Sequence, residues 1–278
     1  MPKPISTRIF TVANQKGGVG KTTTAVNIAA ALSMGGLRTL VIDLDPQGNA
    51  STAFGVPRDE VDGMYEVIIK DKKLSDVLLK VPGFPDLEIA PATQSLANAE
   101  VELVPMVARE LRLKKALTHY LSEAAQRGER FDYVIIDCPP SLGLLTINAL
   151  VAADELLIPI QCEYYSLEGL TLLLHTVSLI QEHLNPNIKL STIVLTMFDG
   201  RTRLANDVAD EVRKHYPEQL IDIPIPRAVR VSEAPSYGQT VMTYDPSSNG
   251  AEAYGLVARE IARRGAPSVT SVTEVGVG

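Results

Sequence analysis

Short, nearly continuous apolar runs recur along the chain and are separated by longer segments of helical composition. The runs cover 9–13, 39–45, 131–137, 155–161 and 191–199. Uninterrupted apolar runs of this length are typical of parallel strands that are covered on both faces. The sequence therefore predicts an α/β fold, in which a single doubly wound, mostly parallel, twisted sheet has helices on both faces.

Helical patterns are expected at 22–32, 71–78, 96–125, 170–183, 204–215 and 249–264, with Asn249 as a plausible cap. Pro105 should interrupt the third of them. A short strand is expected at 87–91, and the proline-punctuated segment 221–227 should be an edge-like strand. Segments 163–169 and 230–238 are expected to be loops. Residues 1–264 should form one domain, followed by a small, polar and disordered tail at 265–278.

The first apolar run leads into a glycine-rich loop, Lys16-Gly17-Gly18-Val19-Gly20-Lys21-Thr22-Thr23, and a helical run follows it. Strand, glycine loop and helix form the context in which backbone N–H groups turn toward a phosphate. The start of the helix adds its positive dipole end. In such loops the lysine reaches the β- and γ-phosphates and the hydroxyl binds Mg²⁺, which assigns Lys21 and Thr22.

Two features depart from the common pattern G-x-x-x-x-G-K-[ST]. Gln15 occupies the position of the first glycine, and a second lysine, Lys16, stands at the start of the loop. A lysine there is not needed to hold phosphate within the same chain. It is either a solvated charge at a loop tip or a side chain that reaches phosphates across a subunit interface, and the residues alone leave both readings open.

Two of the apolar strands end in carboxylates, at the edge where such sheets bind their ligands. Asp43 and Asp45 alternate along the run 39–45 and should point to the same side. Either such an aspartate only caps the next turn or helix, or one of the pair positions an attacking water and the other supports a metal. Asp137 closes the run 131–137 as a Walker B carboxylate does, and would accept from a water bound to Mg²⁺.

The loop KGGVGKTT resembles the variant phosphate loop of the ParA/MinD superfamily of ATPases. The longer stretch NQKGGVGKTTTAVNIAAAL most resembles the ParA/Soj chromosome-partitioning branch, and the likeness continues by segment order to about Arg264. It implies a P-loop ATPase that binds ATP and Mg²⁺. In that family the first loop lysine, here Lys16, contacts the nucleotide of the partner subunit in an ATP-sandwiched dimer.

The resemblance also implies roles for residues outside the loop. Asp45 takes the water-orienting role, so that Lys16, Lys21 and Asp45 form the expected catalytic set, with Thr22, Asp137 and Asp43 near the metal. The segment DCPPSLG, which begins at Asp137, would sense the γ-phosphate. Part of the adenine pocket would lie on the strand-end prolines Pro224 and Pro226.

The net charge of −7 does not suggest a nucleic-acid partner. Six bases and six acids cancel between 196 and 231, although Arg201 and Arg203, and Arg227 and Arg230, form local pairs on two loops. TMFDGRT and PIPRAVRVSEAPSYG resemble ParA/Soj segments whose arginines bind DNA without sequence preference. By position Arg201 and Arg230 match those arginines, and Arg203 and Arg227 are weaker candidates. Such contacts would be to phosphates and would depend on salt.

The function implied by the resemblance is ATP-dependent DNA partitioning in chromosome segregation. ATP would join two subunits into a homodimer, and the homodimer would bind nonspecific double-stranded DNA. A ParB-like centromere-binding protein would stimulate an otherwise slow hydrolysis, and ADP would release the dimer. The expected location is cytoplasmic and nucleoid-associated, which two isolated cysteines also fit.

Two other classes of ATPase are alternatives to a partitioning ATPase. A MinD-type membrane-cycling ATPase relies on a basic amphipathic C-terminal helix, whereas 267–278 contains no lysine or arginine, so a membrane partner is not expected. An ATPase similar to the nitrogenase iron protein needs cysteines at a cluster interface. Cys138 and Cys162 lack CxxC spacing, so this class of ATPase is not expected.

Overall fold

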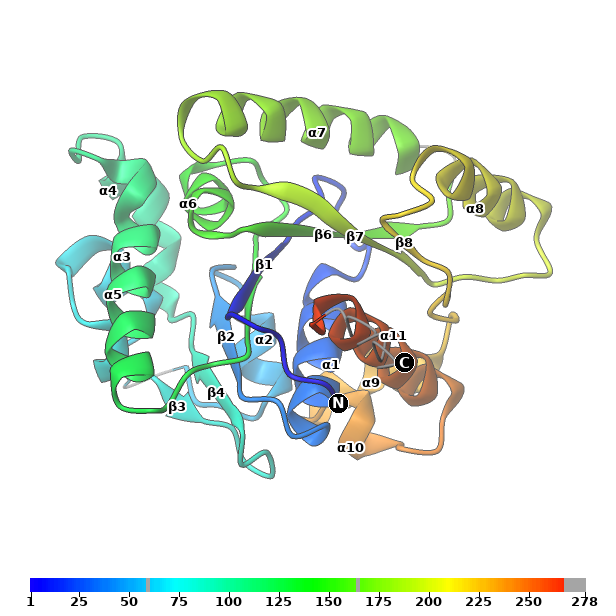
Figure 1. The fold of residues 1–278 in the computed structure, drawn as a ribbon, viewed down its shortest axis with the longest axis horizontal. Helices are drawn as coiled ribbons and strands as arrows, with labels where there is room; N and C mark the ends of the chain where they lie inside the picture. The colour runs from blue at the N-terminus through cyan, green and yellow to red at the C-terminus, as the bar shows by residue number, and fades with distance from the viewer. Residues whose placement is uncertain (59–60, 164–165, 268–278) are drawn as a thin grey trace, which may run out of the picture.

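The computed structural model describes residues 1–58, 61–163 and 166–267. A sheet of eight strands crosses this part of the chain in the order β3-β4-β2-β5-β1-β6-β7-β8, with helices on both faces (Figure 1). Neighbouring strands are parallel except β3 with β4, which confirms the predicted fold class. The strands are β1 (Arg8–Val12), β2 (Thr39–Asp43), β3 (Leu79–Lys80), β4 (Leu87–Ala90), β5 (Tyr133–Asp137), β6 (Glu155–Gln161), β7 (Lys189–Thr196) and β8 (Leu220–Ile221).

Helices connect most of these strands. The α-helices are α1 (Lys21–Met34), α2 (Asn49–Ala53), α3 (Met64–Lys70), α4 (Ala99–Leu103), α5 (Arg112–Gln126), α6 (Leu144–Ala152), α7 (Ser166–His183), α8 (Arg203–His215), α9 (Val229–Glu233), α10 (Val241–Tyr244) and α11 (Asn249–Gly265). Short 3₁₀ helices are η1 (Leu74–Asp76), η2 (Gln94–Asn98), η3 (Arg109–Leu111) and η4 (Ala234–Tyr237). Across the described ranges, no helix has the length and hydropathy needed to cross a membrane.

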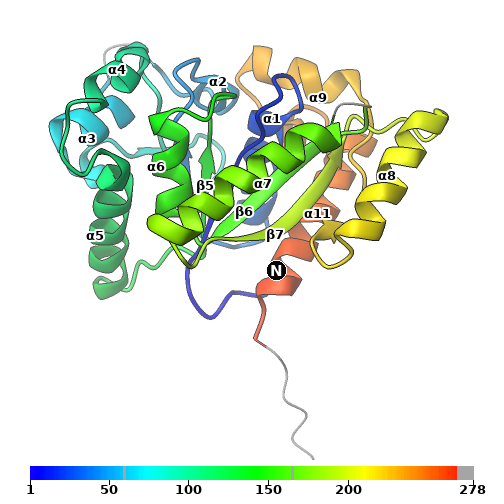
Figure 2. The same cartoon turned by 90° about the horizontal axis from the view of Figure 1, so that it is seen from above.

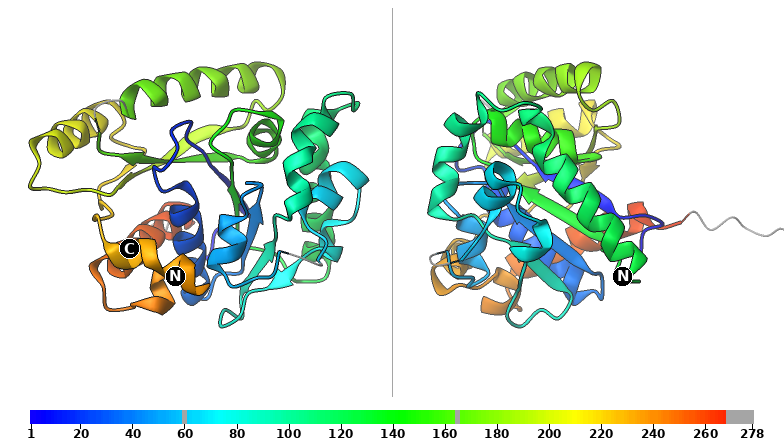
Figure 3. Two further views of the ribbon diagram at one scale, coloured as in Figure 1. Left: turned by 180° about the vertical axis from the view of Figure 1, so that it is seen from behind. Right: turned by 90° about the vertical axis from the view of Figure 1, so that its left-hand side faces the viewer.

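Helices lie on both faces of the sheet (Figure 1, Figure 3), and two buried apolar clusters hold them there. On one face α1 packs against α11, and Ile28 and Tyr254 belong to the same buried cluster. On the other face α5, α6 and α7 contribute Leu117, Leu150 and Leu173 to a second cluster. Every residue of β2 and β5 is buried. This double coverage explains why both strands are apolar runs without alternation.

Parallel pairing brings the segments that follow the strands to one edge of the sheet. The loop after β1 and the helices α2, α4 and α9 lie along this edge in Figure 2. Within the sheet Val12 pairs with Asp137 and Asp137 pairs with Asp43, so the ends of three neighbouring strands are aligned. Because ligands of such sheets bind beyond the carboxyl ends of the strands, the fold brings the predicted site residues to the expected edge.

The sequence pattern does not predict α6, and it predicts a loop where α9 and η4 lie. Helix α6 is almost wholly buried, and its polar residues Thr146 and Asn148 are buried together with the apolar ones, so it lacks the exposed polar face that marks an amphipathic helix. Helices α9 and η4 are too short to show a helical period. Helix α7 begins at Ser166, within the segment 163–169 that was expected to be a loop.

Several element boundaries also differ from the expected ones. The helix expected at 71–78 is reduced to η1, whereas the break near Pro105 is confirmed, since α4 ends at Leu103 and α5 begins at Arg112. Segment 221–227 is regular strand only at its start, in β8, and has one further isolated parallel bridge between Pro226 and Phe198. Pro224 and Pro226 have no N–H to donate to a continuous ladder.

The last helix is capped by Ser248, whose hydroxyl accepts from the N–H of Ala251 at 3.3 Å. Asn249, the expected cap, is therefore the first helical residue. The helix ends at Gly265, close to the predicted domain boundary at 264. Residues 268–278, most of the predicted tail, lie outside the described residues.

Candidate functional site

The loop between β1 and α1 presents its backbone without obstruction. An added Cβ at Gly17 or Gly18 would meet no atom of the described residues within 4 Å. Gly18 and Gly20 have φ values of 74° and 84°, in the left-handed region that favours glycine. Gly20 precedes α1, and none of the described side chains caps the first turn of that helix. Its N–H groups are therefore available to an anion.

Lys21, the first residue of α1, is buried beside this loop. Its ammonium group donates to the carbonyl oxygen of Lys16 at 3.2 Å, so the side chain turns back along the loop. Burial lowers the pKa of Lys21, and the negative charges of Asp137 and Asp45 oppose that change. The cation thus lies between the glycine loop and the acidic strand ends, as a phosphate-binding lysine requires.

Asp137, the last residue of β5, is completely buried. Neither of its carboxylate oxygens accepts a well-formed hydrogen bond from the described part of the chain. Burial and the neighbouring charge of Asp43 raise the pKa of Asp137 well above its usual range, while the Thr22 hydroxyl and the Lys21 ammonium oppose the rise. A buried carboxyl group without a partner is costly, so this group is suited to a cation and its bound waters.

Asp43, the last residue of β2, holds the turn that follows it. Its carboxylate accepts from the N–H of Ser51 at 2.9 Å, from the Ser51 hydroxyl at 2.7 Å and from the N–H of Asp45 at 3.2 Å. Burial raises the pKa of Asp43 to about 6, although the bonds from Ser51 oppose this. Asp43 therefore caps the turn that follows it, and any support of a metal by Asp43 would pass through this turn.

Asp45 lies beyond the end of β2, so the two aspartates do not alternate along one strand as expected. Its Oδ1 accepts from the N–H of Gln47 at 2.9 Å, and the residue is 7% exposed. The charge of Asp45 acts on the pKa of both Lys21 and Asp137. Asp45 is therefore part of the same electrostatic site, on a short turn rather than on the sheet.

These residues fit a magnesium ion that is bound together with a triphosphate. Among the described residues, no group of three or more His, Cys, Asp or Glu side chains could hold a metal unaided. Mg²⁺ in nucleotide sites is usually held by one or two protein oxygens together with phosphates and waters. The unpartnered carboxylate of Asp137 and the hydroxyl of Thr22, beside the open loop, match this kind of site.

A cavity of about 320 Å³ opens next to the loop, with Gly20 and Thr23 in its wall. Its size is at the lower end for ligand pockets, and it is large enough for a nucleobase. Pro226 lines the cavity as predicted, together with Ile225 and Tyr254, whereas Pro224 is not among its lining residues.

The end of β7 forms the junction between this cavity and the phosphate loop. The Thr196 hydroxyl donates to the carbonyl oxygen of Val19 at 2.8 Å. The next residue, Met197, has a φ of 50°, which is uncommon for a residue with a side chain. Met197 also lines the cavity, so the strained backbone lies at the site itself, where such strain tends to be found.

Lys16 lies on the exposed side of the loop and is held within its own chain. Its ammonium group forms an ion pair with Glu163 at 2.6 Å, and its N–H donates to Asn14 Oδ1 at 3.0 Å. The other carboxylate oxygen of Glu163 accepts from Gln161 at 2.6 Å. Lys16 and Glu163 are 31% and 46% exposed, so the pair is accessible to solvent and can open.

Arg201 and Arg230, the two strongest candidates for DNA contact, are both exposed and both paired. The guanidinium of Arg201 makes two hydrogen bonds to Asp199, at 2.8 and 2.7 Å, which lower the pKa of Asp199 to about 2. Arg230 is paired with Glu233 at 3.2 Å and with Asp245 at 3.6 Å. Exposed ion pairs contribute little to stability, so these arginines can exchange a carboxylate for a phosphate.

The two weaker candidates occupy different places. Arg203 begins α8, is 94% exposed and has only a long ion pair of 3.6 Å with Asp207. Arg227 lines the cavity beside the phosphate loop and makes no ion pair with another described residue. Of the four arginines only Arg227 lines this cavity, and Arg201, Arg203 and Arg230 lie on exposed segments outside its lining.

Comparison with known proteins agrees with this geometry. Residues 7–190 match the AAA_31 family model, described as an AAA domain. The sporulation initiation inhibitor protein Soj of Bacillus subtilis is 49% identical over 93% of this chain and 99% of its own length. The chromosome partitioning protein ParA of Myxococcus xanthus is 48% identical, over 94% of this chain and 89% of its own. This chain belongs to the Soj/ParA family.

A solved structure also supports the ligands predicted for this Soj/ParA chain. The Mycobacterium smegmatis protein named cobyrinic acid a,c-diamide synthase, with bound ATP analogue and magnesium, has a TM-score of 0.78 at 37% identity. The match covers 93% of this chain and 95% of that one. Its ligands agree with the ATP and Mg²⁺ predicted from the phosphate loop.

Sequence reasoning named the candidate site residues that the structure brings together at the phosphate loop, but it missed the residues that support them. Ser51 holds Asp43, and Glu163 holds Lys16, and neither belongs to a recognisable motif. Thr196 had one usable signal, because a polar residue at the carboxyl end of a parallel strand lies where ligands bind, whereas the apolar Met197 had none.

Proposed function

We propose that this protein is a chromosome-partitioning ATPase that alternates between a monomer and an ATP-bound homodimer. The proposal rests on one observation above all: Lys21, Asp137 and Asp45 act on one another electrostatically beside the open glycine loop. The relatives at 48% and 49% identity are named for partitioning and sporulation control, which favours this role over the synthase named for the mycobacterial structure.

In this proposal the triphosphate lies on the loop from Lys16 to Thr23, with the base in the cavity that Pro226 lines. Lys21 binds the β- and γ-phosphates, and Thr22 and Asp137 hold Mg²⁺, which neutralises charge on the phosphate oxygens. Asp45 orients the attacking water in line with the γ-phosphate, since positioning supplies most of the catalysis in such reactions. Asp43 fixes the turn that carries Asp45.

Dimer formation would use Lys16. In the proposed dimer its ammonium group binds the phosphates of the partner subunit's nucleotide. The ion pair with Glu163 must then open, so Glu163 competes with ATP for this lysine. Exposed pairs of this kind are worth up to about 1 kcal/mol, which is enough to tune the transition but not to prevent it.

Glu163→Gln is therefore expected to promote dimerisation. Lys16 loses its carboxylate partner, and the ATP concentration at half-maximal dimer should fall by up to about fivefold. Analytical ultracentrifugation across an ATP titration with Mg²⁺ measures this. Glu182→Gln, an exposed carboxylate of α7, is the matched control. If Glu163→Gln leaves the midpoint unchanged, the ion pair does not restrain Lys16.

We also propose that the dimer binds nonspecific double-stranded DNA through Arg201 and Arg230, assisted by Arg203 and Arg227. Each subunit contributes only a few phosphate contacts, so one subunit binds weakly. A dimer doubles the contacts, and avidity then makes DNA affinity depend on the nucleotide. A ParB-like partner would stimulate a slow hydrolysis, and the ATP-bound form would be associated with the nucleoid.

Arg230→Glu tests the DNA surface. The ATP-bound dimer should still form, but its DNA affinity should fall about tenfold or more, because the change replaces one attractive contact per subunit with a repulsive one. Electrophoretic mobility shift with ATP at two salt concentrations measures this. Arg263→Glu, an exposed arginine of α11 paired within its own helix, should leave binding intact. Equal DNA affinity of Arg230→Glu and the unchanged protein would exclude Arg230 from the surface.

The complete proposal is tested by DNA binding of the purified protein with ATP, with ADP and without nucleotide. DNA binding that requires ATP supports the proposed dependence of DNA affinity on the bound nucleotide. Equal binding in all three conditions would separate DNA contact from the nucleotide and refute the proposed cycle.

A further inference from the structure

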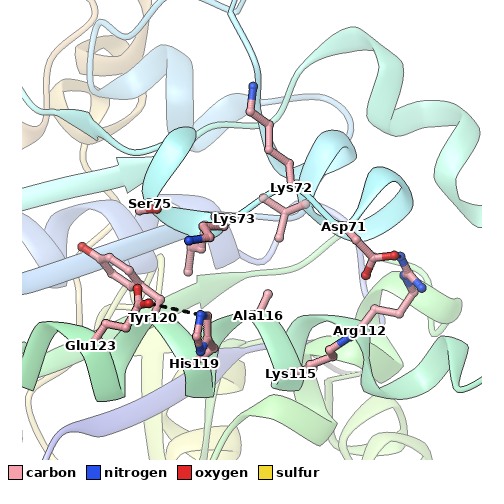
Figure 4. A pocket seen from close by; sticks show the side chains of 12 residues that line it. Asp71, Lys72, Lys73, Ser75, Arg112, Lys115, Ala116, His119, Tyr120 and Glu123 are labelled. Carbon is pink, nitrogen blue, oxygen red and sulfur yellow. Dashed lines mark ion pairs between the residues drawn. The ribbon is translucent and has the colours of Figure 1, made fainter.

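A second concave site lies far from the phosphate loop, in the part of the chain for which the sequence suggested no chemistry. A cavity of about 130 Å³ opens between the segment 71–75 and one side of α5 (Figure 4). We call it the α5 cavity. In Figure 1 helix α5 lies at one side of the molecule, beyond β4, whereas the phosphate loop follows the central strand β1.

The floor of the α5 cavity is apolar. Val67 and Leu74 are each 2% exposed, and both belong to the buried core below. Tyr120 also lines it, and burial raises the pKa of Tyr120 to about 12, so its phenol stays neutral. An apolar cavity of similar volume, about 150 Å³, binds benzene. The α5 cavity therefore has room for one aromatic or branched aliphatic side chain.

The rim of the α5 cavity is cationic, although the whole chain carries a net charge of −7. Three of its basic groups already have carboxylate partners: Lys72 pairs with Asp62, Arg112 with Asp71, and His119 with Glu123.

The two remaining basic groups, Lys73 and Lys115, have no hydrogen bond or ion pair to any other described residue. Figure 4 shows them on opposite walls, Lys73 in the segment after α3 and Lys115 on α5. Their ammonium groups are free to bind an anion at the mouth of an apolar hole.

We propose that the α5 cavity binds a short acidic segment of a partner protein. One phenylalanine or leucine of that segment fills the hole, and neighbouring Asp or Glu side chains bind Lys73 and Lys115. An acidic peptide can bury an apolar side chain on the floor of the cavity, whereas a nucleic-acid backbone has no such group. The carboxylates of Asp71 and Glu123 on the rim would also repel a dense row of phosphates. The α5 cavity shares no lining residue with the phosphate loop or the cavity beside it, and the inference does not depend on the proposed function.

The experiment uses the full-length protein and blocked pentapeptides with phenylalanine or leucine at the centre and two glutamates on each side. Isotope-edited NMR should show saturable shifts confined to 67–75 and α5. A peptide with alanine at the centre should bind at least about tenfold more weakly, because it leaves the cavity unfilled. Shifts scattered over the surface, or equal binding of the alanine peptide, would overturn the proposal, since either would reduce the interaction to charge attraction.

Two variants separate the contributions of charge and shape. Lys73→Glu combined with Lys115→Glu should lower the affinity about tenfold or more, whereas Lys214→Glu on α8 should not change it. Ala116→Phe fills the cavity from within and should abolish binding of the phenylalanine peptide with every rim charge in place. Unchanged binding in either α5-cavity variant would refute the assignment. Benzoate or duplex DNA that binds the cavity as tightly as the peptide would refute a peptide partner.

Discussion

Lys21→Ala is expected to abolish ATP binding. The ammonium group of Lys21 is buried between the glycine loop and the carboxylates of Asp137 and Asp45, where a charged hydrogen bond to phosphate is worth more than at the surface. Without it, the triphosphate faces Asp45 and Asp137 directly. The dissociation constant for ATP with Mg²⁺ should rise about a hundredfold or more, which calorimetry with the purified protein measures.

The matched control is Lys16→Ala, the other lysine of the same loop. That variant should keep ATP binding by the single subunit, yet fail to dimerise, because Lys16 is proposed to act only across the interface. Thermal unfolding of both variants confirms that they are folded. Nucleotide affinity that stays within a factor of three of the unchanged protein in Lys21→Ala would show that this lysine does not bind the phosphates.

Asp45→Ala is expected to separate binding from hydrolysis. ATP should still bind, because Lys21, Thr22 and Asp137 remain. Turnover should fall about a hundredfold to ten-thousandfold with the loss of the group that orients water. The protein should then accumulate as an ATP-bound dimer that elutes early in gel filtration and stays on DNA. Phosphate release and elution volume measure the two effects on one sample.

Asp45→Asn is the control for the turn. Its amide oxygen still accepts from the N–H of Gln47, which Oδ1 of Asp45 now does at 2.9 Å, so the backbone is preserved while the negative charge is lost. This variant should be as inactive as Asp45→Ala. Turnover at the normal rate in either variant would assign the water to another residue.

The features that sequence predicts best here are those built from local chemistry. The phosphate loop needs a glycine string, two lysines and a following helix, all of which are adjacent in the chain. The strand that ends in Asp137 is recognisable because burial on both faces leaves an apolar run. The order of such elements is enough to indicate the doubly wound sheet.

The features that sequence misses depend on contacts between distant segments. The carboxylate of Asp43 accepts a hydrogen bond from the Ser51 hydroxyl. Lys16 forms an ion pair with Glu163, which is 147 residues later in the chain. The α5 cavity joins residues 67–75 to 112–123, and neither segment carries a motif. Helix α6 is also missed, because a helix that is buried on almost every side has no amphipathic pattern from which the sequence could predict it.

The order of strands in the sheet has a consequence for how the chain is made. Strand β1 leads into the phosphate loop and precedes every other strand of the sheet in the chain, but its neighbours in the sheet are β5 and β6. Its hydrogen-bonding partners are therefore synthesised only after residue 133. Because long-range pairing of this kind is slow and leaves apolar edges uncovered, both backbone edges of β1 stay open to non-native pairing until β5 has been synthesised.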